Sequence, residues 1–152
     1  MSPETPNPKK PHNFFQVLLI SAAIVILWLI PVFASSGLGW TACAGAWGIV
    51  SIIALLLTII APLVYGWYSR DETGAILLGV VPFLLTTGVS RIISGNSPAG
   101  IDYRIYSVIY VVLLSLAGGL EGFFAAKKTA GSLLIALVLA GIWAGIFFSG
   151  IH

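Results

Sequence analysis

Charged side chains are scarce in this chain of 152 residues. Asp, Glu, Lys and Arg together make up 8% of the sequence, whereas they make up about 25% of an ordinary soluble domain. None of the four occurs between Lys10 and Arg70. Hydrophobic residues reach 59%, and the mean hydropathy is +1.05. This balance excludes a soluble globular domain and predicts an integral membrane protein.

Cysteine and histidine are also rare, which removes most catalytic and metal chemistry. The single Cys43 allows no internal disulfide and no Cys-x-x-Cys redox motif. His12 and His152 lie near the two ends of the chain, so no histidine pair can hold a haem within the spans and no histidine can complete a hydrolase triad there. We therefore expect no enzyme activity, no catalytic residues, no metal site and no cofactor.

Long apolar runs are what the sequence does contain. A membrane helix needs about 20 apolar residues, and the nearly continuous apolar character of the runs rejects the alternation of a β-barrel strand. The sequence predicts an all-α bundle of five transmembrane helices over 14–152, with helices at about 14–34, 41–68, 73–91, 105–126 and 130–151.

The first run has a second interpretation, as a cleaved signal peptide with Lys9 and Lys10 as its basic region. Its apolar stretch from Phe14 to Ile30 is longer than the roughly 7–15 residues usual in signal peptides. We therefore predict a helix. Residues 1–13 contain four prolines among polar residues, which predicts a disordered cytoplasmic tail or, alternatively, a docking strand for a soluble partner.

The distribution of Lys and Arg over the short joints predicts the orientation of the bundle. Cytoplasmic loops carry an excess of basic residues, so we expect the N-terminus to be cytoplasmic, the C-terminus outside, and the protein to be multi-pass in the cell membrane. The net charge of +2 is too small to indicate nucleic acid, and the lysine pairs are expected to meet anionic lipid headgroups. The basic residues are Lys9, Lys10, Arg70, Lys127 and Lys128 on the predicted inside, and Arg91 and Arg104 on the predicted outside.

Small residues spaced four apart predict close helix contacts. Gly118 and Gly122 share one face of the fourth run, and Gly141, Gly145 and Ser149 share one face of the fifth. Such faces let two backbones approach each other closely. The facing helix is either one of the same chain, which we favour, or one of another subunit, and a homo-oligomer is among the arrangements this allows.

Glu121 is the acidic residue inside an apolar run, about 7 Å from its basic end by helical rise. An intramembrane acid is a functional candidate by default. We favour an orienting ion pair with Arg70, Lys127 or Lys128 over an ion or proton site.

Two further groups are candidate contact sites. Thr86 and Ser90 share a face of the third run. They either bond to their own helix backbone or across to a neighbouring helix, which is the structural role we favour, or line a polar pathway. Arg91, Asp102 and Arg104 flank the turn-forming residues 95–98 and belong either to an outward contact surface or to a simple connector.

These observations leave two classes of function. The first is a non-catalytic accessory or assembly subunit of a larger membrane complex, for example a respiratory or ion-translocating one, acting through helix packing with other integral subunits and lipids. The alternative is a small stand-alone transporter, channel or lipid-binding protein. The first requires packing surfaces, which the sequence shows, and the second requires a selective site.

Overall fold

The computed structural model describes residues 14–38, 44–93 and 101–149, and all but the short joints of this part are helical. Each helix is long and apolar enough to cross a membrane. This confirms the predicted all-α architecture with five candidate spans. The helices are α1 (Phe14–Leu38), α2 (Ala44–Ser69), α3 (Glu72–Ile93), α4 (Ile101–Ala126) and α5 (Ala130–Ser149).

The helix bounds differ from the predicted ones mainly at the end of the bundle away from Lys127. The first helix continues to Leu38, and α4 begins at Ile101 instead of near Ile105. Asp102 therefore lies in the first turn of α4. The N-terminal tail and His152 lie outside the described residues.

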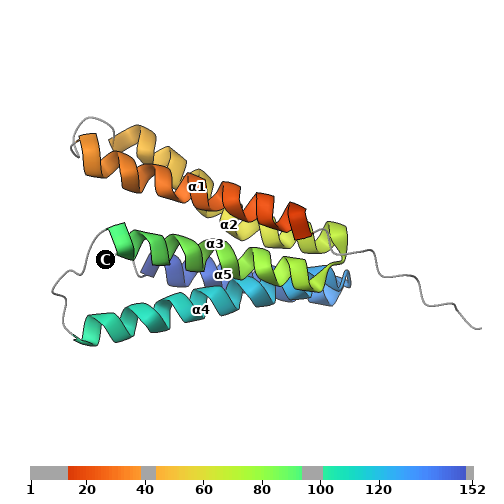
Figure 1. Cartoon of the computed structure of the whole chain (residues 1–152). Helices are drawn as coiled ribbons and strands as arrows, with labels where there is room; N and C mark the ends of the chain where they lie inside the picture. Colours follow the sequence, from red (N-terminus) through yellow and green to blue (C-terminus); the bar gives the residue numbers. More distant parts are fainter. Residues whose placement is uncertain (1–13, 39–43, 94–100, 150–152) are drawn as a thin grey trace, which may run out of the picture.

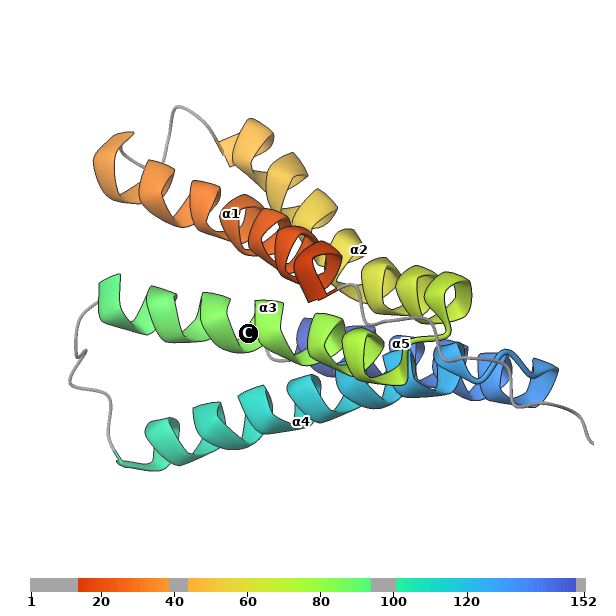
Figure 2. The ribbon, with the colours of Figure 1, turned by 45° about the vertical axis from the view of Figure 1, so that its right-hand side comes forward.

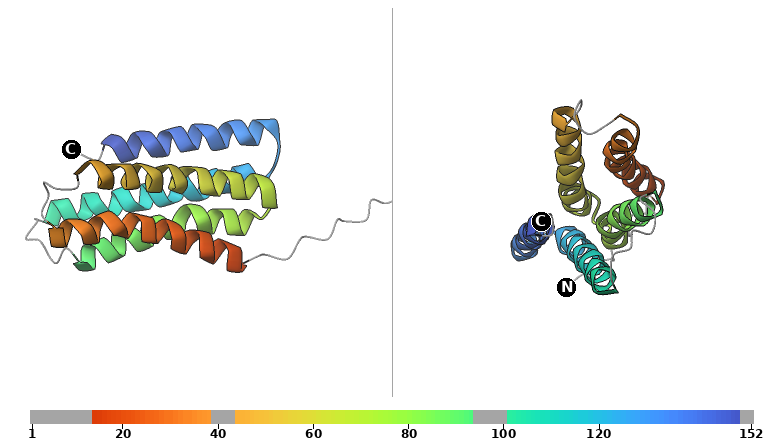
Figure 3. Two further views of the ribbon diagram at one scale, coloured as in Figure 1. Left: turned by 90° about the horizontal axis from the view of Figure 1, so that it is seen from above. Right: turned by 90° about the vertical axis from the view of Figure 1, so that its left-hand side faces the viewer.

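The five helices run up and down, with α3 near the middle of the arrangement (Figure 1). The third helix packs against α4, α1 and α2, whereas α5 packs mainly against α4. Viewed along the bundle, α1 and α5 stand on opposite sides (Figure 3). One end of the bundle collects the start of α1 and the α2–α3 and α4–α5 joints, and we call it the Lys127 end.

Two tight joints at the Lys127 end are built from helix caps. Arg70 and Lys128 adopt left-handed backbone conformations, with φ of 58° and 53°, and each ends the preceding helix. Asp71 then caps α3 by accepting a hydrogen bond from the Gly74 amide at 3.0 Å. Thr129 caps α5 in the same way, because its hydroxyl accepts a hydrogen bond from the Ser132 amide at 3.1 Å. These caps satisfy amides that a helix start leaves without partners.

Toward the other end α3 and α4 diverge (Figure 2), and aromatic side chains pack among the helices. Trp143 of α5 stacks on Phe147 at a centroid distance of 5.3 Å and meets Phe83 of α3 edge-on at 5.8 Å. Trp28 of α1 reaches Phe147 at 5.8 Å. The core cluster of Leu55, Phe83, Leu114, Ala117 and Trp143 thus joins α2, α3, α4 and α5.

Candidate functional site

The glycines of α4 lie where α3 and α4 are closest. A Cβ added to Gly118 would lie 2.7 Å from the carbonyl oxygen of Gly79, and one added to Gly122 would overlap the carbonyl of Ala75. A Cβ on Gly66 of α2 would likewise lie 2.7 Å from the Gly122 oxygen. The structure therefore brings Gly118 and Gly122 to contacts between helices of the same chain, where only glycine leaves room for the facing backbone.

The small residues of α5 are divided between two faces. Ala136 and Ala140 are buried, whereas Gly141 and Gly145 are exposed. Apart from the adjoining backbone of α5 and the two chain neighbours, a Cβ added to either glycine would meet no atom of the described chain within 4 Å. Ser149 is exposed too, and its hydroxyl donates to the Ile146 carbonyl at 2.8 Å. The alanine face serves the contact within the chain, and the face formed by Gly141, Gly145 and Ser149, called the α5 glycine face below, stays open.

Glu121 lies in the interior of the bundle with 1% of its surface exposed. It shares a face of α4 with Leu114 and Ala117, which belong to the core cluster with Leu55 of α2 and Trp143 of α5. Neither carboxyl oxygen has a hydrogen-bond partner within the described chain. An ionised carboxylate held this way would lose several kcal/mol of hydration without compensation.

The structure does not bring the predicted cations to Glu121. Arg70 is exposed at the α2–α3 joint, where its left-handed backbone ends α2. The Lys127 ammonium lies over the Phe123 ring, 4.3 Å from its centroid. The favoured ion pair is therefore not formed, because the basic residues belong to the joints whereas the carboxyl points into the core.

The hydroxyls of α3 bond to their own helix. Thr86 is buried and donates to the Pro82 carbonyl at 2.7 Å, and Thr87 donates to the Phe83 carbonyl at 2.8 Å. Thr86 therefore bonds to its own helix backbone, which is the structural role that we favour from the sequence over a polar pathway. The Ser90 side chain lies outside what the structure describes.

A buried polar contact that the sequence did not reveal joins α1 to α2. The Trp28 indole donates to the Thr58 hydroxyl at 3.0 Å, and this hydroxyl donates to the Ala54 carbonyl at 2.8 Å. Thr58 is 2% exposed. A threonine in an apolar run gives no sign of its partner, so only the contact between the helices identifies it.

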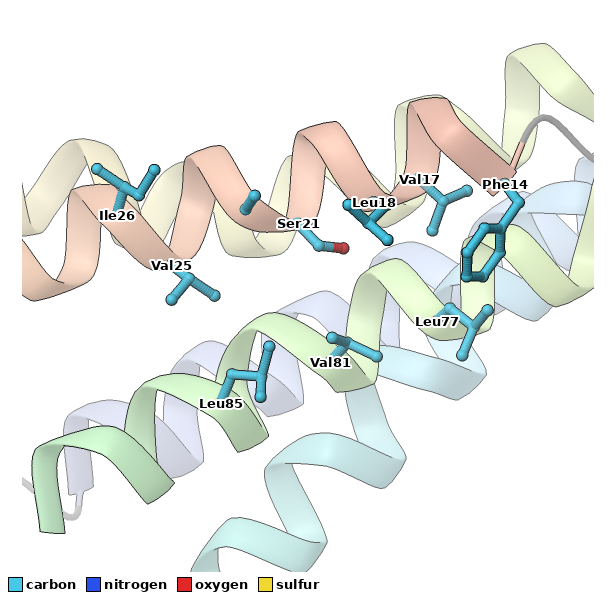
Figure 4. A pocket seen from close by; sticks show the side chains of 10 residues that line it. Phe14, Val17, Leu18, Ser21, Val25, Ile26, Leu77, Val81 and Leu85 are labelled. Carbon is cyan, nitrogen blue, oxygen red and sulfur yellow. The ribbon is translucent and has the colours of Figure 1, made fainter. Parts of the chain in front are cut away.

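An apolar cleft of about 460 Å³ lies between α1 and α3 (Figure 4). Its one polar side chain is Ser21, which is 5% exposed and whose hydroxyl has no hydrogen-bond partner among the described residues. This cleft has no signature in the sequence, because its walls are the same aliphatic residues that form any lipid-facing surface. The other lining residues are Phe14, Val17, Leu18, Ala22, Val25, Ile26, Leu77, Val81 and Leu85.

The remaining predicted contact residues are placed by backbone alone. Arg91 lies near the end of α3, and Asp102 and Arg104 lie in the first turns of α4; the turn residues 95–98 between them are outside the described part. In the part of the chain that the structure describes, no group of three or more His, Cys, Asp or Glu residues could hold a metal ion.

Comparison of the chain with protein-family models, with curated proteins and with solved structures finds no match in any of the three. The geometry of the bundle is therefore the basis for a functional proposal. The class it defines is a multi-pass helical membrane protein.

Proposed function

We propose that this protein is a non-catalytic accessory or assembly subunit of a larger complex in the cell membrane. The observation that carries the proposal is the open α5 glycine face. Two glycines one turn apart create a smooth surface at which another helix can approach closely, and the helices of this chain leave that surface uncovered.

The position of α5 supports the same proposal. This helix stands at the side of the bundle and packs mainly against α4. Its Ala136 and Trp143 are 0% and 1% exposed and hold it to the bundle, so a helix from another subunit can cover the opposite side without displacing contacts within the chain.

The test is to extract the protein at native abundance in mild detergent and to determine the particle mass and every co-purifying subunit. We expect stoichiometric association with other integral membrane proteins. Replacing Gly141 and Gly145 with leucine should abolish this association, because the larger side chains keep the partner backbone away.

Gly88→Leu is the matched control, since Gly88 of α3 is also exposed with open space beside it. The control should retain the complex. A particle that contains this chain alone would contradict the proposal. Equal loss of the complex in the control and the α5 variant would instead show that the α5 glycine face has no special role.

The second candidate is a stand-alone lipid-binding protein, and the cleft between α1 and α3 favours it. Its aliphatic walls suit a hydrocarbon chain, and the Ser21 hydroxyl could serve a single polar group of the lipid. The same extraction separates the two candidates, because this one requires a particle of the chain alone that carries a defined lipid.

A further inference from the structure

Glu121 combines complete burial with two carboxyl oxygens that nothing in the described chain satisfies. Its own helix cannot supply a donor, since the amides within α4 are used in bonds to the carbonyls four residues earlier. A buried carboxylate that meets no cation and no donor of the protein is costly to keep, whereas a neutral carboxylic acid needs far less compensation.

The charged and titratable groups on the surrounding helices do not change this. The fifth helix contains no titratable residue between Ala130 and Ser149. On α2 the hydroxyl of Tyr65 donates to Asp71 at 3.2 Å, and on α3 Glu72 is exposed in the first turn.

The other titratable side chains of the described bundle do not hydrogen-bond to Glu121. On α4 the hydroxyl of Tyr110 donates to the Phe147 carbonyl at 3.0 Å. Tyr68 of α2 and Tyr106 of α4 are exposed. Lys127 lies over the Phe123 ring, and Lys128 follows it at the joint.

We propose that Glu121 is an intramembrane proton-binding site, which holds its proton inside the bundle and exchanges it with water at the Lys127 end. The site lies about 7 Å along the helix axis from Ala126, so a small opening of the helices at this end is sufficient for water to reach it. Release transfers the proton to water and leaves a carboxylate, for which Lys127 and Lys128 provide positive charge at the same end.

The first measurement is the infrared difference spectrum between the wild-type protein and the Glu121→Gln variant, both reconstituted as full-length chains in lipid at pH 7. Glutamine matches the shape of the protonated acid. We expect the wild type to show the carbonyl band of a protonated carboxylic acid that the variant lacks, and this band should shift in heavy water as the proton exchanges. A carboxylate band in its place, or an acid band that never exchanges, would overturn the proposal.

A second measurement needs no variant, so it decides the question even if Glu121→Gln does not fold. A membrane-soluble carbodiimide reacts with protonated carboxyls and is read out by peptide mass spectrometry. The glutamate of a short soluble peptide is protonated in about 1 of 500 molecules at pH 7, so we expect the adduct on Glu121 to exceed that on such a peptide, added to the same vesicles, about 100-fold.

Two outcomes of the carbodiimide experiment would refute the proton site. In the first, the adduct on Glu121 is absent or declines with pH in parallel with that on the soluble peptide. In the second, sodium ions at constant pH prevent the reaction, which would identify a metal cation as the ligand. The proposal does not depend on whether the chain is an accessory subunit, because both measurements use the isolated protein.

Discussion

At the scale of single residues, the short joints of the Lys127 end place two basic side chains in unusual backbone conformations. Arg70 and Lys128 have positive φ values, which are costly for residues with a Cβ. The Arg70 amide still donates to the Gly66 carbonyl at 3.1 Å, so the conformation closes the helix end as a glycine usually does.

Replacing Arg70 with glycine should therefore stabilise the protein by roughly 1 kcal/mol, because glycine adopts this conformation without the steric cost. Thermal unfolding in detergent measures the change. Arg70→Ala is the control, since it removes the same charged side chain and keeps the Cβ. If both variants gain equally, the charge and not the backbone conformation is responsible.

The surroundings of Glu121 are a property that the sequence alone does not predict. Glu121 stands out in the sequence because it is an acid in an apolar run, but its environment depends on the direction of its side chain. Basic residues within two turns of it suggested an ion pair, yet Lys127 turns to the Phe123 ring. Proximity along a chain does not determine which side chains meet.

At the scale of the helices, α3 and α4 form the closest pair, and Gly79 faces Gly118 at their crossing. The spacing of Gly118 and Gly122 indicates a close contact from sequence alone. That spacing does not identify the facing helix, since five apolar runs offer several equivalent candidates. The structure assigns α3 to this contact and leaves the similar face of α5 open.

Gly79→Ala should destabilise the bundle by about 1–3 kcal/mol, because the new methyl group would overlap the Gly118 carbonyl and force α3 and α4 apart. Unfolding measured in the same detergent gives the value. Gly88→Ala lies on the same helix with nothing within 4 Å of the added carbon, so its effect should stay within about 0.5 kcal/mol. A similar loss in both variants would mean that the crossing has no special role, because alanine favours a helix more than glycine does and helix propensity cannot cause a loss.

At the scale of the whole molecule, the alternation of five helices places the C-terminal ends of α4 and α5 at opposite ends of the bundle (Figure 1). The basic residues of the two joints collect at the Lys127 end, which the positive-inside rule predicts to be cytoplasmic. The orientation in a membrane remains a prediction from charge.

Single cysteines introduced at Lys127 and at Ser149, in a Cys43→Ser background, test this orientation. We expect a membrane-impermeant thiol reagent added outside intact cells to label the cysteine at 149 and to leave the cysteine at 127 unlabelled. Permeabilised cells serve as the control, and both positions should then react. Labelling of position 127 alone in intact cells would invert the predicted topology.

The sequence by itself determined that this chain spans a membrane with five helices, because hydropathy over about 20 residues is a local property. It also indicated which faces of α4 and α5 are smooth, since a spacing of four is local too. Tertiary structure alone decided that α4 uses its glycines within the described chain while α5 does not, that Trp28 meets Thr58, and that Glu121 is enclosed without a partner among the described residues. In helices that are apolar on nearly every side, the pairing of faces depends on the complementary shape of distant segments, which no local pattern encodes.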